Sequence, residues 1–125
     1  KVNFIPKAER SIKTNTSEVR TYFVFCRLDF KIHGTDLKLY AYVEDTNQVK
    51  QLFVPFKDKT CGKSTYLAGR FMDLTYNGET DLITLDFNLA YNPYCHYSHS
   101  YSCPLVPFEN TLPISIEAGE KKLHD

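Results

Sequence analysis

The residues with the most evident chemical potential lie in the segment 86–110, which crowds carboxylates, amides, tyrosines, histidines and two cysteines together. Within it, Cys95, His96, His99 and Cys103 are the ligand types of a tetrahedral zinc site. Usual zinc motifs add a distant second ligand pair, whereas these four all lie between positions 95 and 103. Zinc is therefore the weaker alternative, and we expect no resident metal or other cofactor.

The same two cysteines are the best candidates for a disulfide. A bridge between Cys95 and Cys103 would close a short loop and contribute about 2–3 kcal/mol if it is oxidised and unstrained. An exported protein would allow this bond, and a cytosolic protein would keep both thiols reduced. Cys26 lies in an apolar strand pattern and is expected to be a small buried hydrophobic residue.

A cysteine nucleophile is a further alternative. Cys61 lies between Lys59 and Lys63, and nearby positive charge lowers a thiol pKa. The surrounding K-D-K-T-C-G-K-S lacks the first glycine that a phosphate-binding loop requires. A solvated, lysine-rich loop is the favoured interpretation.

Alternation of apolar and polar side chains predicts the strands that position these groups. Residues 20–32 place Tyr22, Val24, Cys26, Leu28, Phe30 and Ile32 on one parity. Turn residues at 33–36 and renewed alternation over 37–43 predict a β-hairpin. Residues 51–56 predict a third strand, in which Pro55 indicates an edge, an end or a bulge.

A second hairpin is predicted between residues 66–75 and 81–89, joined by Tyr76, Asn77 and Gly78. Pairing Thr75 with Glu79 makes one face apolar, through the pairs Phe71 with Ile83, Gly69 with Leu85 and Leu67 with Phe87. The opposite face then carries a polar quartet: Tyr66, Arg70, Asp86 and Asn88.

The predicted fold class is all-β. About six strands in chain order, with a last strand over 113–117, indicate a small antiparallel meander that closes into a barrel. A sandwich is the alternative, and a long proline-rich loop would lie between the last two strands. We expect a single domain over residues 1–125.

The predicted ligand site combines the quartet with residues of the long loop: Tyr66, Arg70, Asp86, Asn88, Asn92, Glu109 and Asn110. Arg70 offers a planar fork for an anionic group, so the first hypothesis is a domain that binds a small polar or anionic molecule. An alternative is a small-molecule hydrolase with Asp86 and Glu109 as acid and base. The competing structural interpretation is an Arg70–Asp86 ion pair with amides that satisfy loop carbonyls.

Composition narrows the partners and the compartment. Fifteen basic and fifteen acidic residues cancel, which disfavours binding to nucleic acid. No apolar run approaches the roughly 18 residues of a membrane-spanning helix. The chain begins at Lys1, so we expect that an N-terminal segment of the full-length protein is missing. If that segment carried a signal, the protein would be exported to the periplasm or envelope, where a structural or interaction role is a third possibility.

Three ordered motifs carry a family resemblance: F-V-P-F-K-D-K-T-C-G-K-S-T-Y-L-A-G-R-F-M-D-L, D-F-N-L-A-Y-N-P-Y-C and C-P-L-V-P-F-E-N-T-L. With them the chain, from about Phe4 to Lys121, resembles domain-of-unknown-function family 1684 of bacterial and archaeal proteins. The resemblance implies no reaction, but it implies an additional N-terminal segment and, in some bacterial members, export.

The residues that match the family pattern include the quartet and many of its neighbours: Phe53, Pro55, Phe56, Asp58, Thr60, Gly62, Thr65, Tyr66, Gly69, Arg70, Asp73, Asp86, Asn88, Tyr91, Asn92, Pro93, Cys95, Cys103, Pro104, Glu109, Asn110, Glu117 and Gly119. Cys61, Ala68 and Val106 depart from the pattern, and His96 and His99 are not part of it. The resemblance therefore favours a shared role for the carboxylates and amides over a shared metal site.

Overall fold

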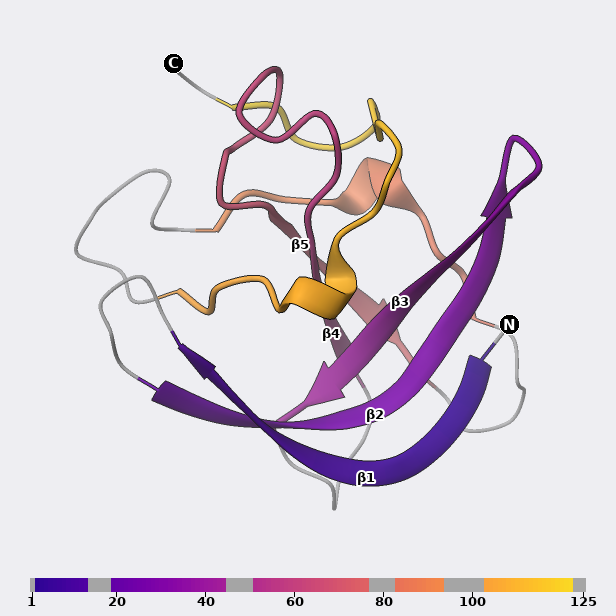
Figure 1. The fold of residues 1–125 in the computed structure, drawn as a ribbon, viewed down its shortest axis with the longest axis vertical. Coiled ribbons are helices and arrows are strands. Elements are labelled where there is room, and N and C mark those ends of the chain that lie inside the picture. The colour runs from indigo at the N-terminus through magenta and orange to yellow at the C-terminus, as the bar shows by residue number, and fades with distance from the viewer. Residues whose placement is uncertain (1, 14–18, 45–50, 77–82, 94–102, 123–125) are drawn as a thin grey trace.

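A single antiparallel sheet organises the chain. The computed structural model describes residues 2–13, 19–44, 51–76, 83–93 and 103–122. The strands follow one another in sheet order: β1 (Val2–Lys13), β2 (Val19–Ile32), β3 (Thr35–Val43), β4 (Gln51–Phe56) and β5 (Arg70–Thr75) (Figure 1). The predicted all-β class and the antiparallel meander are confirmed.

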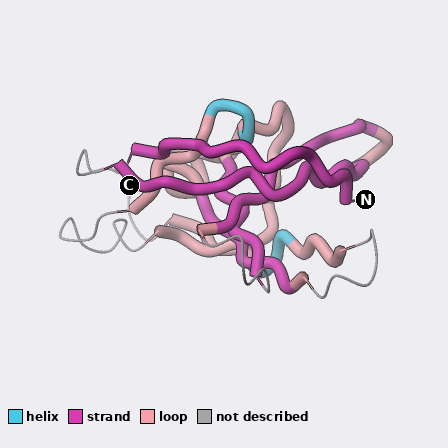
Figure 2. The backbone as a smooth tube through the Cα atoms, turned by 90° about the horizontal axis from the view of Figure 1, so that it is seen from below, coloured by secondary structure: helices cyan, strands magenta, loops and turns pink. Residues whose placement is uncertain are grey.

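The predicted closure into a barrel is not observed among the described residues. The sheet is open, with β1 and β5 at its two edges. Its two faces are covered instead by irregular segments and two 3-10 turns, η1 (Phe87–Leu89) and η3 (Phe108–Asn110). Figure 2 shows one such turn, in cyan, on either side of the strands. Loops thus bury the apolar surface that barrel closure would otherwise have hidden.

The β2–β3 hairpin confirms the first sequence prediction. Its two-residue turn has positive φ at both His33 (48°) and Gly34 (80°). This is the geometry that matches the twist of paired strands and that glycine adopts without strain. β4 also lies where it was predicted. Pro55 is its second-to-last residue, which agrees with the expectation that this proline marks an end of the strand.

The edge strand β1 was not predicted from the sequence. It pairs antiparallel with β2, from Val2 opposite Leu28 to Lys13 opposite Val19. The register shifts between Phe4 and Ala8. A bulge interrupts the period-two pattern of a strand, so alternation alone does not reveal it.

A second bulge divides β2 between the two faces of the sheet. Val24 lies opposite Tyr42, but Cys26 lies opposite Ala41, so Phe25 is an extra residue. One inserted residue reverses the face on which later side chains lie. The prediction that alternate residues of this strand share one face of the sheet is therefore wrong for the set Tyr22, Val24, Cys26, Leu28, Phe30 and Ile32.

The main core lies on the face that includes Cys26 and Leu28. It buries alternating residues of β3, β4 and β5 together with residues of the covering segments: Leu37, Leu39, Ala41, Val43, Leu52, Val54, Phe56, Met72, Leu74, Ala90, Leu112 and Ile116. The second face carries smaller aromatic clusters that contain Tyr22, Tyr42, Phe53 and Phe71. Both faces of the central strands are covered.

The predicted hairpin between residues 66–75 and 81–89 is wrong in its described part. Residues 83–86 form no strand, and residues 87–89 form η1. Phe71 instead exchanges two backbone hydrogen bonds of 2.9 Å with Tyr91. Asn77 and Gly78 of the predicted loop lie outside the described residues.

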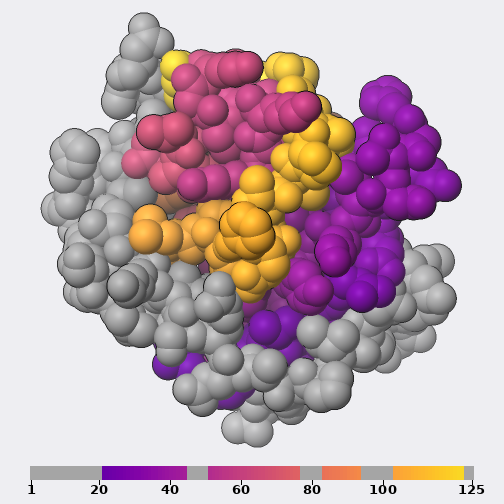
Figure 3. Space-filling model, in the orientation of Figure 1, coloured from indigo at the N-terminus to yellow at the C-terminus, as the bar shows by residue number. Residues whose placement is uncertain are grey.

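The predicted last strand over residues 113–117 is likewise irregular. Backbone bonds still tie residues 110–114 to the segment after β4, since the Leu112 N–H donates to the Lys57 carbonyl and the Lys59 N–H to the Ile114 carbonyl. Figure 3 shows segment 103–112, in orange, between the loop 57–69 and the β2–β3 hairpin. No helix in the described part of the chain is long and apolar enough to cross a membrane.

Candidate functional site

Arg70, the centre of the predicted ligand site, is sealed inside the protein. Its side chain has 0% exposure and lies on the main-core face, where its guanidinium is 5.1 Å from the centre of the Phe56 ring. Asp58, and not Asp86, is its acidic partner, at 3.4 Å between Nη2 and Oδ2. Burial lowers the pKa of the Arg70 guanidinium, and the Asp58 carboxylate opposes this shift.

Asp58 anchors a buried polar network that the sequence did not identify. Its Oδ1 accepts from the Thr60 hydroxyl at 2.7 Å, and its Oδ2 accepts from the Ile116 N–H at 2.6 Å. Since Thr60 donates to Asp58, the Thr65 hydroxyl donates the bond that joins the two threonines at 2.8 Å. Buried charge is tolerated when it is paired and hydrogen-bonded, as here.

Asp58 and Arg70 together hold residues 114–122, here called the tail. Arg70 Nη2 donates to the Ile116 carbonyl at 3.0 Å and Nη1 to the Ala118 carbonyl at 2.6 Å. Gly119 has φ of 91°, and a Cβ there would lie 2.6 Å from the Phe87 carbonyl oxygen and 3.0 Å from Arg70 Nη1. The close approach of the tail to Arg70 therefore requires glycine.

Asn92 supports the same tail. Its backbone N–H donates to Glu120 Oε1 at 2.6 Å, and its side-chain amide donates to the Lys121 carbonyl at 3.0 Å. Arg70 and Asn92 thus donate hydrogen bonds to the tail, while the ion pair that the structural interpretation gave to Arg70 and Asp86 is formed by Arg70 and Asp58.

Asp86 and Asn88 bond to each other, and Arg70 pairs with Asp58 instead. Asp86 is the N-cap of η1, and its Oδ1 accepts from both the backbone and the side-chain nitrogen of Asn88 at 3.0 Å. This is the local bond that favours a short polar residue at the start of a turn. The predicted strand face shared by Tyr66, Arg70, Asp86 and Asn88 does not form, because the described residues 83–89 form no strand.

Asn110 fills a gap between β3 and β4. The only backbone register pair between these two strands in the described chain is Tyr42 with Phe53. Beyond it, Asn110 accepts from the Tyr40 N–H at 2.8 Å and donates to the Tyr40 and Pro55 carbonyls at 2.9 and 2.7 Å. Its amide replaces the missing strand-to-strand bonds of backbone groups that would otherwise be buried without partners.

Glu109 lies next to Asn110 and contacts the second face of the sheet. Its Oε2 accepts from the Tyr42 hydroxyl at 2.9 Å. Phe87 of η1 packs against the main core, whereas Glu109 of η3 binds Tyr42 of the second face, so the two turns lie on opposite sides of the strands (Figure 2). This placement does not bring the two carboxylates to one substrate.

The remaining predicted groups lie near the second face or outside the described residues. Tyr66 is half-buried and packs with Phe71 and Cys103. Cys103 is buried, but Cys95, His96 and His99 lie outside the described residues, so the disulfide and the zinc site stay predictions. Elsewhere in the described chain, no three His, Cys, Asp or Glu side chains are grouped as a metal would require.

The thiol of Cys61 is not activated by its lysine neighbours. It donates to Asp58 Oδ1 and accepts from the Asp58 N–H, at 3.5 and 3.4 Å. Burial raises the pKa of this thiol, and the Asp58 charge adds to the rise. Cys26 is fully buried, and burial raises its pKa to about 11.

The raised pKa of Cys26 also links folding to pH. The folded state keeps the Cys26 proton more tightly than an unfolded thiol of pKa 9.0, so the contribution of this thiol to folding stability is retained below pH 9.0 and is lost as the pH rises towards about 11.

We expect Cys26 to resist iodoacetamide in the native protein at pH 8, and Cys61 to react more slowly than in the unfolded chain. Peptide mass spectrometry after timed alkylation, with guanidinium-unfolded protein as the control, measures each site. Native Cys26 that reacts as fast as unfolded Cys26 would contradict the burial argument.

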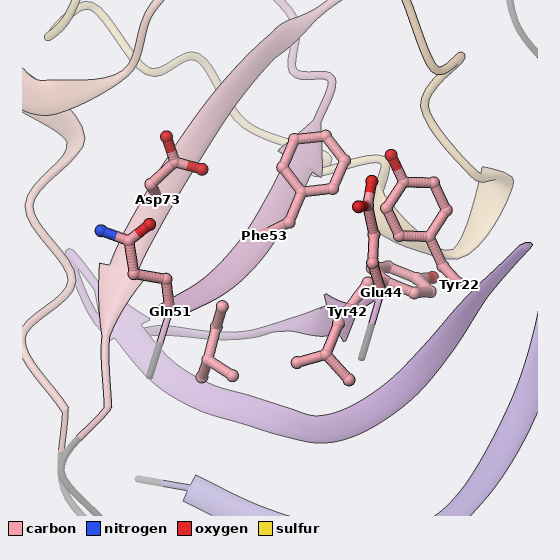
Figure 4. A pocket seen from close by; sticks show the side chains of 8 residues that line it. Tyr22, Tyr42, Glu44, Gln51, Phe53 and Asp73 are labelled. Atoms are coloured by element: carbon pink, nitrogen blue, oxygen red, sulfur yellow. The ribbon is translucent and has the colours of Figure 1, made fainter. Parts of the chain in front are cut away.

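A cavity on the second face of the sheet has aromatic and acidic residues on its lining. Its volume is about 350 Å³. It is lined by residues of β2, β3, β4 and β5: Tyr22, Tyr42, Val43, Glu44, Gln51, Leu52, Phe53 and Asp73. In Figure 4 the carboxylates of Asp73 and Glu44 approach this aromatic cavity from its two sides, with the Phe53 ring between them.

Two other recesses offer less to a ligand. One lies along the β2–β3 hairpin, where four of the charged residues on its lining are already paired, Arg27 with Asp29 and Lys31 with Asp36. The other lies beside η3, where apolar residues such as Leu112 and Pro113 contribute to its walls. The aromatic cavity differs because its exposed carboxylates border stacked rings.

The sequence did contain a signal for this cavity. Tyr42 and Phe53 occupy the parity positions where a solvent-facing strand surface would carry polar residues. Large aromatic residues at such positions indicate a second covered face. The Phe25 bulge hid the matching contribution of Tyr22, because it places Tyr22 and Cys26 on different faces.

Residues 1–121 of the chain match a family model that is described as a protein of unknown function (DUF1684). The chain belongs to the DUF1684 family. The sequence-based resemblance is therefore confirmed. No curated protein matches the chain.

A solved structure supports the fold of this DUF1684 protein. The solution NMR structure of an uncharacterized protein from gene locus rrnAC0354 of Haloarcula marismortui matches it with a TM-score of 0.76 and 36% identity. The match covers 96% of this chain and 67% of the archaeal chain. Neither comparison names a ligand or a reaction, so no function is established.

Proposed function

We propose that this DUF1684 protein is a binding domain for a small polar molecule, and that the ligand enters the aromatic cavity. The observation that carries the proposal is the combination of about 350 Å³ of space with aromatic walls and exposed carboxylates. Small-molecule sites are typically recesses of about 300–1,000 Å³ with apolar walls and a few placed polar groups.

The rings of the cavity are held in place by one another, which favours a preformed site. Tyr22 stacks on Phe53 with ring centres 5.6 Å apart, and Phe53 meets Phe71 edge-on at 4.8 Å. Hydrogen bonds also orient the cavity's polar groups, since Tyr42 donates to Glu109 and Tyr91 donates to Asp73 at 2.8 Å. A rigid wall lowers the entropy cost of binding.

The site that the sequence predicted around Arg70 has less support as a ligand site. Its guanidinium is buried against Asp58 and the tail, so an anion would have to displace these contacts and desolvate itself. Binding at Arg70 stays a prediction, and the aromatic cavity is the better candidate because its polar groups already meet solvent.

The test is a screen of small sugars, amino acids, amines and carboxylic acids by two-dimensional NMR, followed by titration of each hit. We expect hits to shift the amide signals of residues 42–44, 51–53 and 73. Replacing Phe53 with Leu removes one ring while keeping apolar volume, and should weaken binding about fivefold to tenfold.

Phe108→Leu is the matched control, because Phe108 is 90% exposed and does not line the cavity. Its affinity for each hit should equal that of the wild type. Hits whose shifts map elsewhere, or an unchanged affinity in a folded Phe53→Leu variant, would show that the aromatic cavity is not the binding site.

A further inference from the structure

The charge of the aromatic cavity has one sign. Glu44, directly after β3, and Asp73 of β5 are exposed carboxylates on its lining. Among the described residues that line it, none is Lys, Arg or His. Because the chain as a whole has fifteen residues of each charge, this negative character is local. An anionic ligand would meet repulsion there, and a cation would meet attraction.

The aromatic residues on the lining also favour a positively charged ligand. An aromatic ring carries negative potential on its face, and a cation within about 6 Å of the ring centre is attracted to it. Of the aromatic residues on its lining, Tyr42 is 0% and Tyr22 is 3% exposed, so the half-buried Phe53 provides the ring that a ligand can reach. The Tyr42 hydroxyl donates to the Glu109 carboxylate, which increases the electron density of that ring.

Asp73 is oriented for this role. Its Oδ2 accepts from the Tyr91 hydroxyl at 2.8 Å, and Tyr91 is itself held by backbone bonds to Phe71. The Phe71 ring meets both the Tyr91 ring and the Phe53 ring edge-on. The packed rings of Tyr91 and Phe71 therefore link Asp73 to Phe53 on the cavity lining.

We infer that the ligand of the aromatic cavity is a small organic cation, an amine or a quaternary ammonium compound. The Phe53 ring would contact its alkyl groups and its charge, while Glu44 and Asp73 would balance that charge from the rim. This inference rests on the proposed function and adds the chemical class of the ligand.

The test compares two probes of the same shape and different charge. Choline carries a quaternary ammonium, and 3,3-dimethylbutan-1-ol is its neutral carbon analogue. We expect choline to bind at least about fivefold more tightly in NMR titrations, with shifts at residues 42–44, 51–53 and 73. Raising the salt concentration should weaken choline binding and leave the neutral probe unaffected.

Charge-removing variants locate the effect. Glu44→Gln and Asp73→Asn should each weaken choline binding about twofold to fivefold, and the double variant about tenfold. Asp36→Asn is the matched control, because it removes the same charge from an exposed residue at the opposite end of β3. Choline binding to this variant should be unchanged.

The two proposals fail in different ways. If a neutral or anionic compound of the screen binds in the cavity and choline binds no better than its carbon analogue, the cation inference is overturned and the binding function stands. If no compound of either set shifts the cavity signals at millimolar concentration, both are overturned. Equal losses of choline affinity in Asp36→Asn and Asp73→Asn would also overturn the inference, since the effect would be one of net charge.

Discussion

Asp58→Asn is expected to destabilise the protein by about 3–5 kcal/mol, because it leaves the Arg70 charge buried without its partner. The substitution also weakens two further contacts, since an amide replaces the carboxylate that accepts from Thr60 and from the Ile116 N–H. Urea unfolding followed by circular dichroism measures the change in the free energy of unfolding.

Two variants make this prediction specific. Asp86→Asn changes a solvent-accessible cap of η1 and should cost less than about 1 kcal/mol. Asp58→Asn combined with Arg70→Met removes both charges, and should be more stable than Asp58→Asn alone. A double variant that is less stable than the single one would mean that the ion pair is not the origin of the loss.

Asn110→Ala is expected to cost about 2–4 kcal/mol, because one buried and two partly buried backbone groups lose their partners. These groups are the N–H and carbonyl of Tyr40 and the carbonyl of Pro55. Chemical unfolding gives the total effect, and hydrogen exchange gives its location. The Tyr40 amide should exchange faster in the variant, because it donates to Asn110 in the wild type.

Asn88→Ala is the control for Asn110→Ala. Asn88 is exposed and its side chain bonds only to Asp86 among the interactions described here, so its loss should stay within about 0.5 kcal/mol. If Asn110→Ala unfolds at the same urea concentration as the wild type, β3 and β4 do not depend on the Asn110 amide.

The residues that carry the family resemblance have mostly structural contacts in this protein. Asp58 and Arg70 hold the tail, Asn92 binds the end of the tail, and Asn110 joins β3 to β4. Gly119 allows the tail to approach Arg70. An open sheet covered by irregular segments needs such side chains, because those segments have few regular backbone partners of their own.

Local patterns were sufficient for part of the fold. The hairpin of β2 and β3 and the position of β4 follow from alternation, turn chemistry and the place of Pro55, all of which act within a few residues. The pairing of residues 66–75 with 81–89 was wrong, because β5 takes Tyr91 as its partner, and that choice depends on packing of Phe71 with distant rings.

The sequence by itself determined the all-β class, the first hairpin, the third predicted strand and the family. Only the tertiary structure decided which face each side chain occupies and which charges meet. A single bulge at Phe25 separates Tyr22 from Cys26, and burial of Arg70 is possible only because Asp58 lies beside it. Periodicity is a local property, whereas the cost of burying a charge is set by neighbours that are distant in sequence, so the aromatic cavity and the Asp58–Arg70 pair emerge only when the chain is folded.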